Sequence, residues 1–211
     1  KAETEKIISQ IPANLIPKVP TPKRVAIFSS SEGSTMEGLF EAQRRGRIPN
    51  VEFALFVSDS KDAGAVAKAK ALGVKHIEIL EPQKGESAED YDREIVNLLR
   101  EFKPDYILLA GWMRIFSSLY CDQFGDITLN AHPSLLPKYA GLKDKEIHQQ
   151  VLEYEDKYTG ASIHRVIAEV DAGDVVVQRK VLVEEHDDPD SLKEKVQKQE
   201  ILGFCEVLEK R

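Results

Sequence analysis

The feature that most constrains the fold is an alternation of short apolar stretches with amphipathic ones over the first two-thirds of the chain. Residues 106–110 are apolar throughout, as expected for a strand covered on both faces of a parallel sheet. Residues 88–102 carry apolar side chains at helical spacing. We expect strands at residues 25–28, 51–57, 76–80, 106–110 and 127–130, and helices at 36–45, 63–72, 88–102 and 117–124. The alternation predicts an α/β fold with a doubly wound, mostly parallel sheet and helices on both faces.

The last third of the chain departs from this alternation. β-branched runs at residues 162–167 and 175–183 are separated by a turn at 169–174, and a final helix is expected at about 191–209. The two runs predict an antiparallel addition to the sheet, arranged as a hairpin or as a crossover. Prolines at positions 12, 17, 20 and 22 favour an extended segment. We therefore expect a lead-in at residues 1–23 and a single domain at residues 24–211.

Charge and composition argue against several classes of function. The chain has 29 basic and 36 acidic residues and a net charge of -7, which gives no support for binding nucleic acid or an anionic membrane. Cys121 and Cys205 lie in no CxxC or metal-ligand spacing, which favours a reducing, cytoplasmic compartment and no bound metal. The sequence begins at Lys1 without a methionine, so organelle targeting and a natural fusion stay open. We expect a monomer or homodimer that acts on small molecules.

The strongest chemical signal is an amide and an imidazole at the end of a predicted strand. Asn130 and His132 are two residues apart, so their side chains point to the same side of an extended segment. Ligands of doubly wound sheets bind beyond the carboxyl ends of the strands. Asp171, in a later turn, can orient the imidazole. Without a Ser or Cys nucleophile, these groups favour acyl transfer with no covalent enzyme intermediate. The alternative is a capping histidine, a turn asparagine and a turn-forming aspartate.

A loop of small residues follows the first predicted strand at positions 29–35. Backbone N–H groups at a helix N-terminus can bind a phosphate, and small residues leave room for one. The alternative is a tight turn without a ligand. Glu32 opposes an anion unless its side chain points outward.

The final helix carries an acidic residue in an apolar row. Leu192, Val196, Glu200, Phe204 and Leu208 follow one another at intervals of four residues. Burying a carboxylate there is costly without a partner. Glu200 therefore either reaches solvent or points into a cleft, where it can receive a cationic amine.

Other polar residues give weaker signals. Arg114 follows the most apolar strand and lines a cleft for an anionic ligand or lies on the surface. His164 lies in a strand and faces either the core or the cleft. We expect His76, His148 and His186 to be ordinary surface residues.

Four segments together resemble a known family. Residues 109–115 (LAGWMRI), 130–141 (NAHPSLLPKYAG), 170–173 (VDAG) and 196–200 (VQKQE) resemble the phosphoribosylglycinamide formyltransferases of purine synthesis. Their order and approximate spacing agree from about residue 24 to the C-terminus. The motifs are specific for the folate-dependent formyltransferases, and the resemblance implies their Rossmann-like fold. The lead-in has no counterpart that we recognise.

The resemblance implies a role for each matching residue. Asn130, His132 and Asp171 would be catalytic. The co-substrate 10-formyltetrahydrofolate would lie at Met113, Arg114, Ile115, Ala140, Gly141 and Ala168. Glycinamide ribonucleotide would place its phosphate at Gly33, Ser34 and Thr35 and its ribose and amine at Gln197 and Glu200. The chain departs from the family pattern in the phosphate loop, where Ser31 replaces a glycine and Thr35 an asparagine.

The expected reaction is direct attack of the substrate amine on the formyl carbon. Asn130 and protonated His132 would stabilise the oxyanion, Asp171 would hold the imidazole, and a bound water is one route for the proton. A formyltetrahydrofolate hydrolase would use the same three residues with water, but it would leave Gln197 and Glu200 unexplained. A sugar-nucleotide N-formyltransferase and a non-catalytic folate- or nucleotide-binding module are further alternatives.

Overall fold

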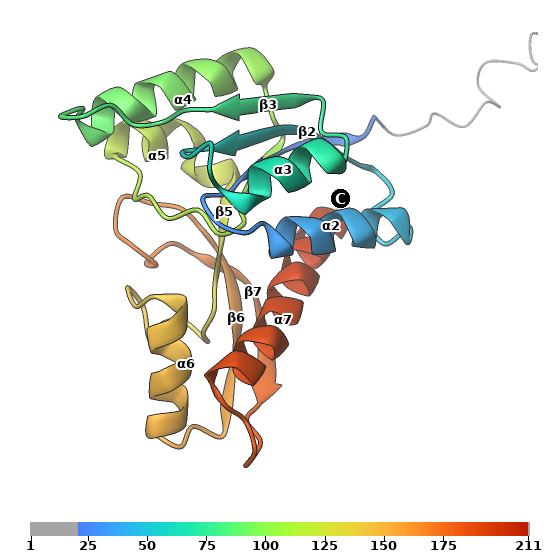
Figure 1. Cartoon of the computed structure of the whole chain (residues 1–211), viewed down its shortest axis with the longest axis vertical. Coiled ribbons are helices and arrows are strands. Elements are labelled where there is room, and N and C mark those ends of the chain that lie inside the picture. The colour runs from blue at the N-terminus through green and yellow to red at the C-terminus, as the bar shows by residue number, and fades with distance from the viewer. Residues whose placement is uncertain (1–20, 211) are drawn as a thin grey trace, which may run out of the picture.

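The computed structural model describes residues 21–210, so the lead-in expected at residues 1–23 lies almost entirely outside the described residues. Seven strands form one sheet in the order β3-β2-β1-β4-β5-β6-β7 (Figure 1). Their bounds are β1 (Lys23–Phe28), β2 (Val51–Ser58), β3 (His76–Ile79), β4 (Tyr106–Leu109), β5 (Thr128–His132), β6 (Tyr158–Arg165) and β7 (Val175–Leu182). Neighbours among β1–β5 pair in parallel, whereas β6 and β7 are antiparallel additions. The predicted fold class is confirmed.

The helices lie in the connections between strands, except for α7, which follows β7. Their bounds are α2 (Ser34–Arg44), α3 (Gly64–Ala71), α4 (Ala88–Phe102), α5 (Ser118–Phe124), the 3-10 turn η1 (Gly125–Ile127), α6 (Asp144–Glu153) and α7 (Pro189–Glu209). The strand order reverses between β1 and β4, so the loops after these two strands diverge. Such a switch point opens a crevice at the carboxyl ends of the strands.

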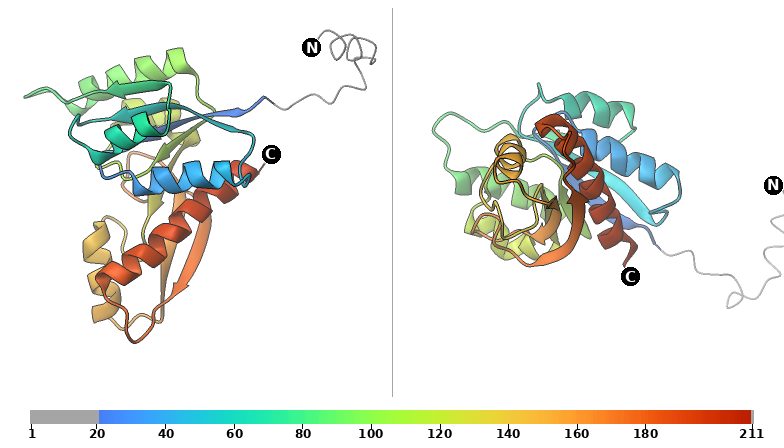
Figure 2. Two further views of the ribbon diagram at one scale, coloured as in Figure 1. Left: turned by 45° about the vertical axis from the view of Figure 1, so that its right-hand side comes forward. Right: turned by 90° about the horizontal axis from the view of Figure 1, so that it is seen from below.

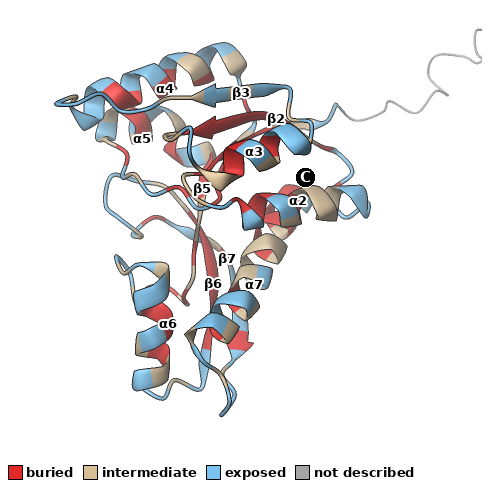
Figure 3. Ribbon diagram, in the orientation of Figure 1, coloured by how far each residue is buried: buried red, intermediate tan, exposed pale blue. Residues whose placement is uncertain are grey.

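Apolar side chains cover both faces of the central strands. Val25 and Ile27 of β1 belong to the core cluster that includes α2, α3 and α7 residues. Ala26 and Phe28 of the same strand belong to the cluster formed with α4 and α5. This two-sided burial explains why these strands are apolar without alternation. Figure 2 shows the helices around the sheet, and Figure 3 shows buried residues along the strands and the adjoining helix faces.

The structure corrects several sequence-based boundaries. β6 and β7 form an antiparallel pair, which settles the choice between hairpin and crossover. β6 begins at Tyr158, before the expected β-branched run, because the pairing with β7 extends through Gly160 and Ala161. β5 reaches His132, so both predicted catalytic side chains on this segment belong to the strand itself.

Helix α6 was not expected from the sequence. Most of its residues are polar. It buries Ile147, His148 and Val151, and Ile147 and Val151 pack with Leu192 of α7. The expectation that His148 is a surface residue is wrong, since it is 1% exposed and its Nε2 lies 3.0 Å from Asp144 Oδ1. Pairing with a residue one turn earlier gives one ring nitrogen of this buried side chain a partner. Within residues 21–210, every helix is too short or too polar to cross a lipid bilayer.

Candidate active site

A cleft of about 630 Å³ lies at the carboxyl ends of β1, β4 and β5. Its walls come from the β1–α2 loop, the segment after β4, the end of β5, the segment after β6, the start of α6, and α7. Most residues proposed from the sequence line it: Ser34, Thr35, Met113, Arg114, Ile115, Asn130, His132, Gly141, Asp171, Gln197 and Glu200. Gly33, Ala140 and Ala168 do not line this cleft, although each is next to a residue that does.

The three predicted catalytic residues meet at this cleft. Asp171 Oδ2 lies 3.1 Å from His132 Nδ1, and Asp171 Oδ1 lies 3.4 Å from His164 Nε2. The same His164 nitrogen is 3.0 Å from Asn130 Nδ2. The side chains therefore form a continuous polar chain from His132 through Asp171 and His164 to Asn130.

His164 is the site residue whose direction the sequence left open. It lies directly across from Asn130 in the antiparallel pairing of β5 and β6, so both side chains emerge on the same face of the sheet. Its Nδ1 donates to the carbonyl of Arg165 at 2.8 Å. In that neutral tautomer, Nε2 accepts from the Asn130 amide. The Asn130 side chain is thereby oriented and keeps a second N–H for a ligand.

His132 is held at both ring nitrogens. Nδ1 faces Asp171, and Nε2 lies 3.1 Å from the carbonyl oxygen of Tyr139. A ring that carries both protons can donate to the two oxygens at once. The ring is 4% exposed, so its positive charge in that form lies beneath the cleft surface.

Asp171 is kept ionised by its partners. Burial alone would raise its pKa, but hydrogen bonds from His132 and the Gly141 N–H outweigh burial and hold the pKa well below its ordinary value. The residue adopts a positive φ of 54° in the turn after β6. A Cβ on nearby Gly173 would overlap the carbonyl oxygen of Arg165, so glycine lets this turn pack on the end of β6. The Asp-Ala-Gly sequence thus places the carboxylate against His132.

The N-terminus of α2 opens into the same cleft. Gly33 precedes the helix at φ 74°, and within the described residues no side chain caps the first turn. The first N–H groups of the helix are therefore available to an anion. Glu32 does not compete for them, because its carboxylate lies over Gly64 at the start of α3. Ser31 does not adopt a positive φ. Serine therefore replaces the family's glycine at this position without backbone strain.

Glu200 faces the cleft from α7, as one of the two sequence interpretations predicted. The four apolar members of its row, Leu192, Val196, Phe204 and Leu208, are buried. Thr35 Oγ1 donates to Glu200 Oε2 at 3.4 Å. Burial raises the pKa of Glu200 to about 8, the charge of Asp144 adds to this, and the Thr35 hydroxyl and Lys193 oppose it. The raised pKa favours the protonated form of the Glu200 carboxyl group near neutral pH.

Exposed apolar side chains also line the cleft. Met113 and Ile115 are 68% and 66% exposed, and Ile167 and Val170 are also exposed. The guanidinium of Arg114 lies 4.3 Å from the centre of the Tyr91 ring, which holds it by a cation–π contact. Exposed apolar side chains of this kind suit a flat aromatic ligand.

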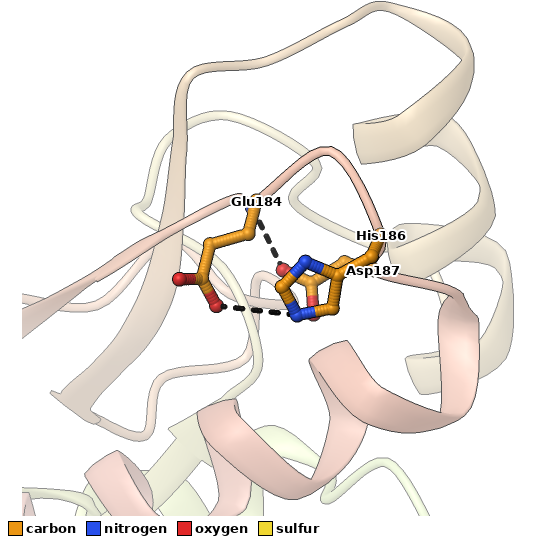
Figure 4. A group of neighbouring side chains, drawn as sticks. All are labelled: Glu184, His186 and Asp187. Atoms are coloured by element: carbon orange, nitrogen blue, oxygen red, sulfur yellow. Dashed lines mark hydrogen bonds and ion pairs between the residues drawn. The ribbon is translucent and has the colours of Figure 1, made fainter.

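One group of acidic and histidine side chains outside the cleft has ligand atoms close enough to share a metal ion: Glu184, His186 and Asp187 (Figure 4). The ammonium of Lys195 lies 2.8 Å from Asp187 Oδ1 and also pairs with Glu184. A protein cation therefore already neutralises these carboxylates, and we assign them to an ion-pair network at the start of α7.

Comparison with known proteins bears on the identity of this cleft. Residues 23–208 match the formyl transferase family. The chain belongs to this family. It is 36% identical over 176 residues to the phosphoribosylglycinamide formyltransferase of Escherichia coli (strain K12), an alignment that covers 83% of this chain and 81% of that protein.

Other relatives of this formyl transferase extend the comparison. It is 32% identical over 208 residues to the trifunctional purine biosynthetic protein adenosine-3 of Drosophila melanogaster, which covers 98% of this chain and 14% of that protein. The structure of the phosphoribosylglycinamide formyltransferase from Bacillus halodurans superposes with a TM-score of 0.79 at 33% identity, over 88% of this chain and 93% of that one.

Proposed function

We propose that this formyl transferase moves a formyl group from 10-formyltetrahydrofolate to the amine of glycinamide ribonucleotide. The observation that carries the proposal is the position of the Asn130–His164–Asp171–His132 chain in one cleft with two unlike walls. One wall offers the N-terminus of α2 and Glu200, and the other offers the exposed apolar side chains of Met113 and Ile115. A phosphorylated amine and a folate require such a pair of surfaces.

The acceptor fits the polar wall. The free N–H groups at Ser34 and Thr35 suit its phosphate. Gln197 and the carboxyl group of Glu200 offer hydrogen-bonding groups to ribose hydroxyl groups or to the amine. The residues that resemble the family's acceptor site therefore have chemistry that matches the ligand.

The catalytic residues would act on the formyl carbon between the two walls. The free N–H of Asn130 donates to the oxyanion that forms as the amine nitrogen attacks. The imidazolium of His132, held by Asp171, supplies positive charge beneath that oxyanion. When the bond from carbon to the folate nitrogen breaks, that nitrogen takes up a proton and the amine loses one, so the overall transfer is balanced.

The polar wall favours the transferase over a hydrolase. A formyltetrahydrofolate hydrolase needs the catalytic residues and a water molecule, but no site for a phosphorylated acceptor. Here the Thr35 hydroxyl donates to Glu200 and accepts from Gln197 within the cleft. A sugar-nucleotide N-formyltransferase is another alternative. Its acceptor would place a second phosphate group and a base in the same region.

The deciding experiment measures release of tetrahydrofolate from 10-formyltetrahydrofolate by the purified protein. We expect turnover with glycinamide ribonucleotide and none without an amine. Turnover without amine would identify a hydrolase. Transfer to an amino-sugar nucleotide alone would identify a sugar-nucleotide N-formyltransferase. Binding of folate or nucleotide without turnover would show that the protein is not a catalyst.

We also propose that residues 24–211 act as a single cytoplasmic domain, as a monomer or homodimer, on small-molecule substrates and without a metal. The free thiols of Cys121 and Cys205 are consistent with a reducing compartment. Size-exclusion chromatography with light scattering tests the oligomeric state, and activity in the presence of a chelator tests the requirement for metal.

A further inference from the structure

We propose that the hydroxyl group of Thr35 is a positioning group for Glu200, and that the acceptor phosphate binds the backbone at this residue rather than its side chain. The inference rests on the proposed acceptor site. It concerns the position at which this chain has threonine where the family pattern has asparagine.

The side chain of Thr35 and the backbone of its helical turn have different partners. The residue is 6% exposed in the first turn of α2. Its Oγ1 donates to Glu200 Oε2 at 3.4 Å and accepts from Gln197 Nε2 at 3.5 Å. Both bonds run to α7, so the hydroxyl's one proton is already engaged there. The backbone N–H groups of the same turn remain for an anion.

The bonds to α7, at 3.4 and 3.5 Å, are long enough to shorten. Thr35 is β-branched, which limits its rotamers and fixes the direction of the hydroxyl. A bound acceptor that pulls Glu200 and Gln197 inward would shorten both contacts. Thr35 thus couples the anion-binding turn of α2 to the two polar residues of α7.

Glu200 has few other fixed partners. Among the side chains of residues 21–210, Thr35 supplies its one hydrogen bond. The charged groups that act on it are Asp144 on α6 and Lys193 on α7, and these pair with each other at 2.8 Å. Asp144 also binds His148 at 3.0 Å. Loss of the Thr35 hydroxyl would leave the Glu200 carboxyl group free to rotate, and only the charge of Lys193 would then oppose the effect of burial on its pKa.

Thr35→Val removes the hydroxyl at nearly constant volume, and Thr35→Ser restores it. Thr159→Val is the matched control, because Thr159 is 2% exposed, lies outside the cleft, and its Oγ1 has no hydrogen-bond partner within residues 21–210. All three variants are first compared with the parent protein by circular dichroism and thermal unfolding.

Steady-state kinetics then separate positioning from a merely structural role. We expect Thr35→Val to raise the KM for glycinamide ribonucleotide about tenfold, which is the loss expected for one buried hydrogen bond. Its kcat should stay within about twofold of the parent value. The KM for 10-formyltetrahydrofolate should not change. Thr35→Ser should recover most of the loss, and Thr159→Val should match the parent.

Inhibition by inorganic phosphate tests the second half of the proposal. The inhibition constant should be unchanged in Thr35→Val, since the backbone holds the anion. If the constant rises in parallel with the KM, the hydroxyl contacts the phosphate and the proposal is overturned. An unchanged KM in Thr35→Val overturns it as well.

A readout without turnover keeps the inference separate from the proposed function. The side-chain carboxyl carbon of Glu200 is followed by NMR as pH is varied, with Glu200→Gln for assignment. We expect its titration midpoint to rise in Thr35→Val and to return in Thr35→Ser. A midpoint that does not move refutes the contact even if the protein transfers no formyl group, whereas a shift in an inactive protein refutes only the proposed function.

Discussion

Asp171 Oδ2 lies 3.1 Å from His132 Nδ1, although one residue comes from a turn after β6 and the other from the end of β5. Asp171→Asn replaces the carboxylate with an amide that cannot balance an imidazolium. We predict that kcat falls by roughly a hundredfold or more, because the carboxylate orients the His132 imidazole and accepts from the Gly141 N–H. The measurement is single-turnover formyl transfer.

Asp174→Asn is the matched control for Asp171→Asn. Asp174 is an exposed carboxylate in the same turn and does not line the cleft. We expect it to keep the parent kcat. Equal losses in both variants would mean that charge in the turn, rather than the contact with His132, accounts for the effect.

Asn130 keeps one amide N–H for the proposed oxyanion, because its other N–H is bonded to His164. We predict that Asn130→Ala lowers kcat by a factor of about 100, which corresponds to about 3 kcal/mol for one oxyanion donor. The KM for either substrate should change little. A variant with near-normal kcat and an intact circular-dichroism spectrum would remove Asn130 from the mechanism.

The sequence was sufficient to predict the central sheet and to predict that Asn130 and His132 lie on one side of β5. Apolar runs such as residues 106–110 could lie only in a strand buried on both faces, and the two-residue period placed Asn130 and His132 on the same side. Glu200 could be recognised because a carboxylate in an apolar helical row requires a special environment.

The remaining features depend on contacts between residues distant in sequence, which a local sequence pattern cannot predict. Helix α6 is mostly polar and is stabilised by packing on α7, so its periodicity was too weak to predict. The direction of His164 depends on its register opposite Asn130 in an antiparallel pair. The bond from His132 to the Tyr139 carbonyl depends on the path of the intervening loop.

Glu200 should make stability depend on pH. Its pKa is about 8 in the folded protein and 4.5 as the ordinary value. The folded state therefore binds the proton more tightly, so this contribution to stability is fully present below about pH 4.5 and is lost as pH rises through about 8. We predict that Glu200→Gln flattens the change in Tm between these pH values and is more stable than the parent above pH 8. Thermal unfolding in a series of buffers measures this.

Glu194→Gln serves as the control for that series, because Glu194 is an exposed residue of the same helix. It should follow the parent curve. We also expect Glu200→Gln to raise the KM for the acceptor. An unaltered Tm profile would show that Glu200 titrates as an ordinary surface carboxyl group.

Gly173 determines whether the Asp171 turn can lie against β6. A Cβ at this position would overlap the backbone oxygen of Arg165, which no side-chain rotation can relieve. We predict that Gly173→Ala destabilises the protein by about 2 kcal/mol, or roughly 4–8 °C in Tm, as the turn is forced outward. Because the turn carries Asp171, its displacement should also lower kcat. Gly85→Ala is a useful comparison: this glycine has positive φ but open space around its Cβ, so it should cost stability without lowering kcat. If Gly173→Ala lost stability while kcat stayed at the parent value, the turn would not be what holds Asp171 against His132.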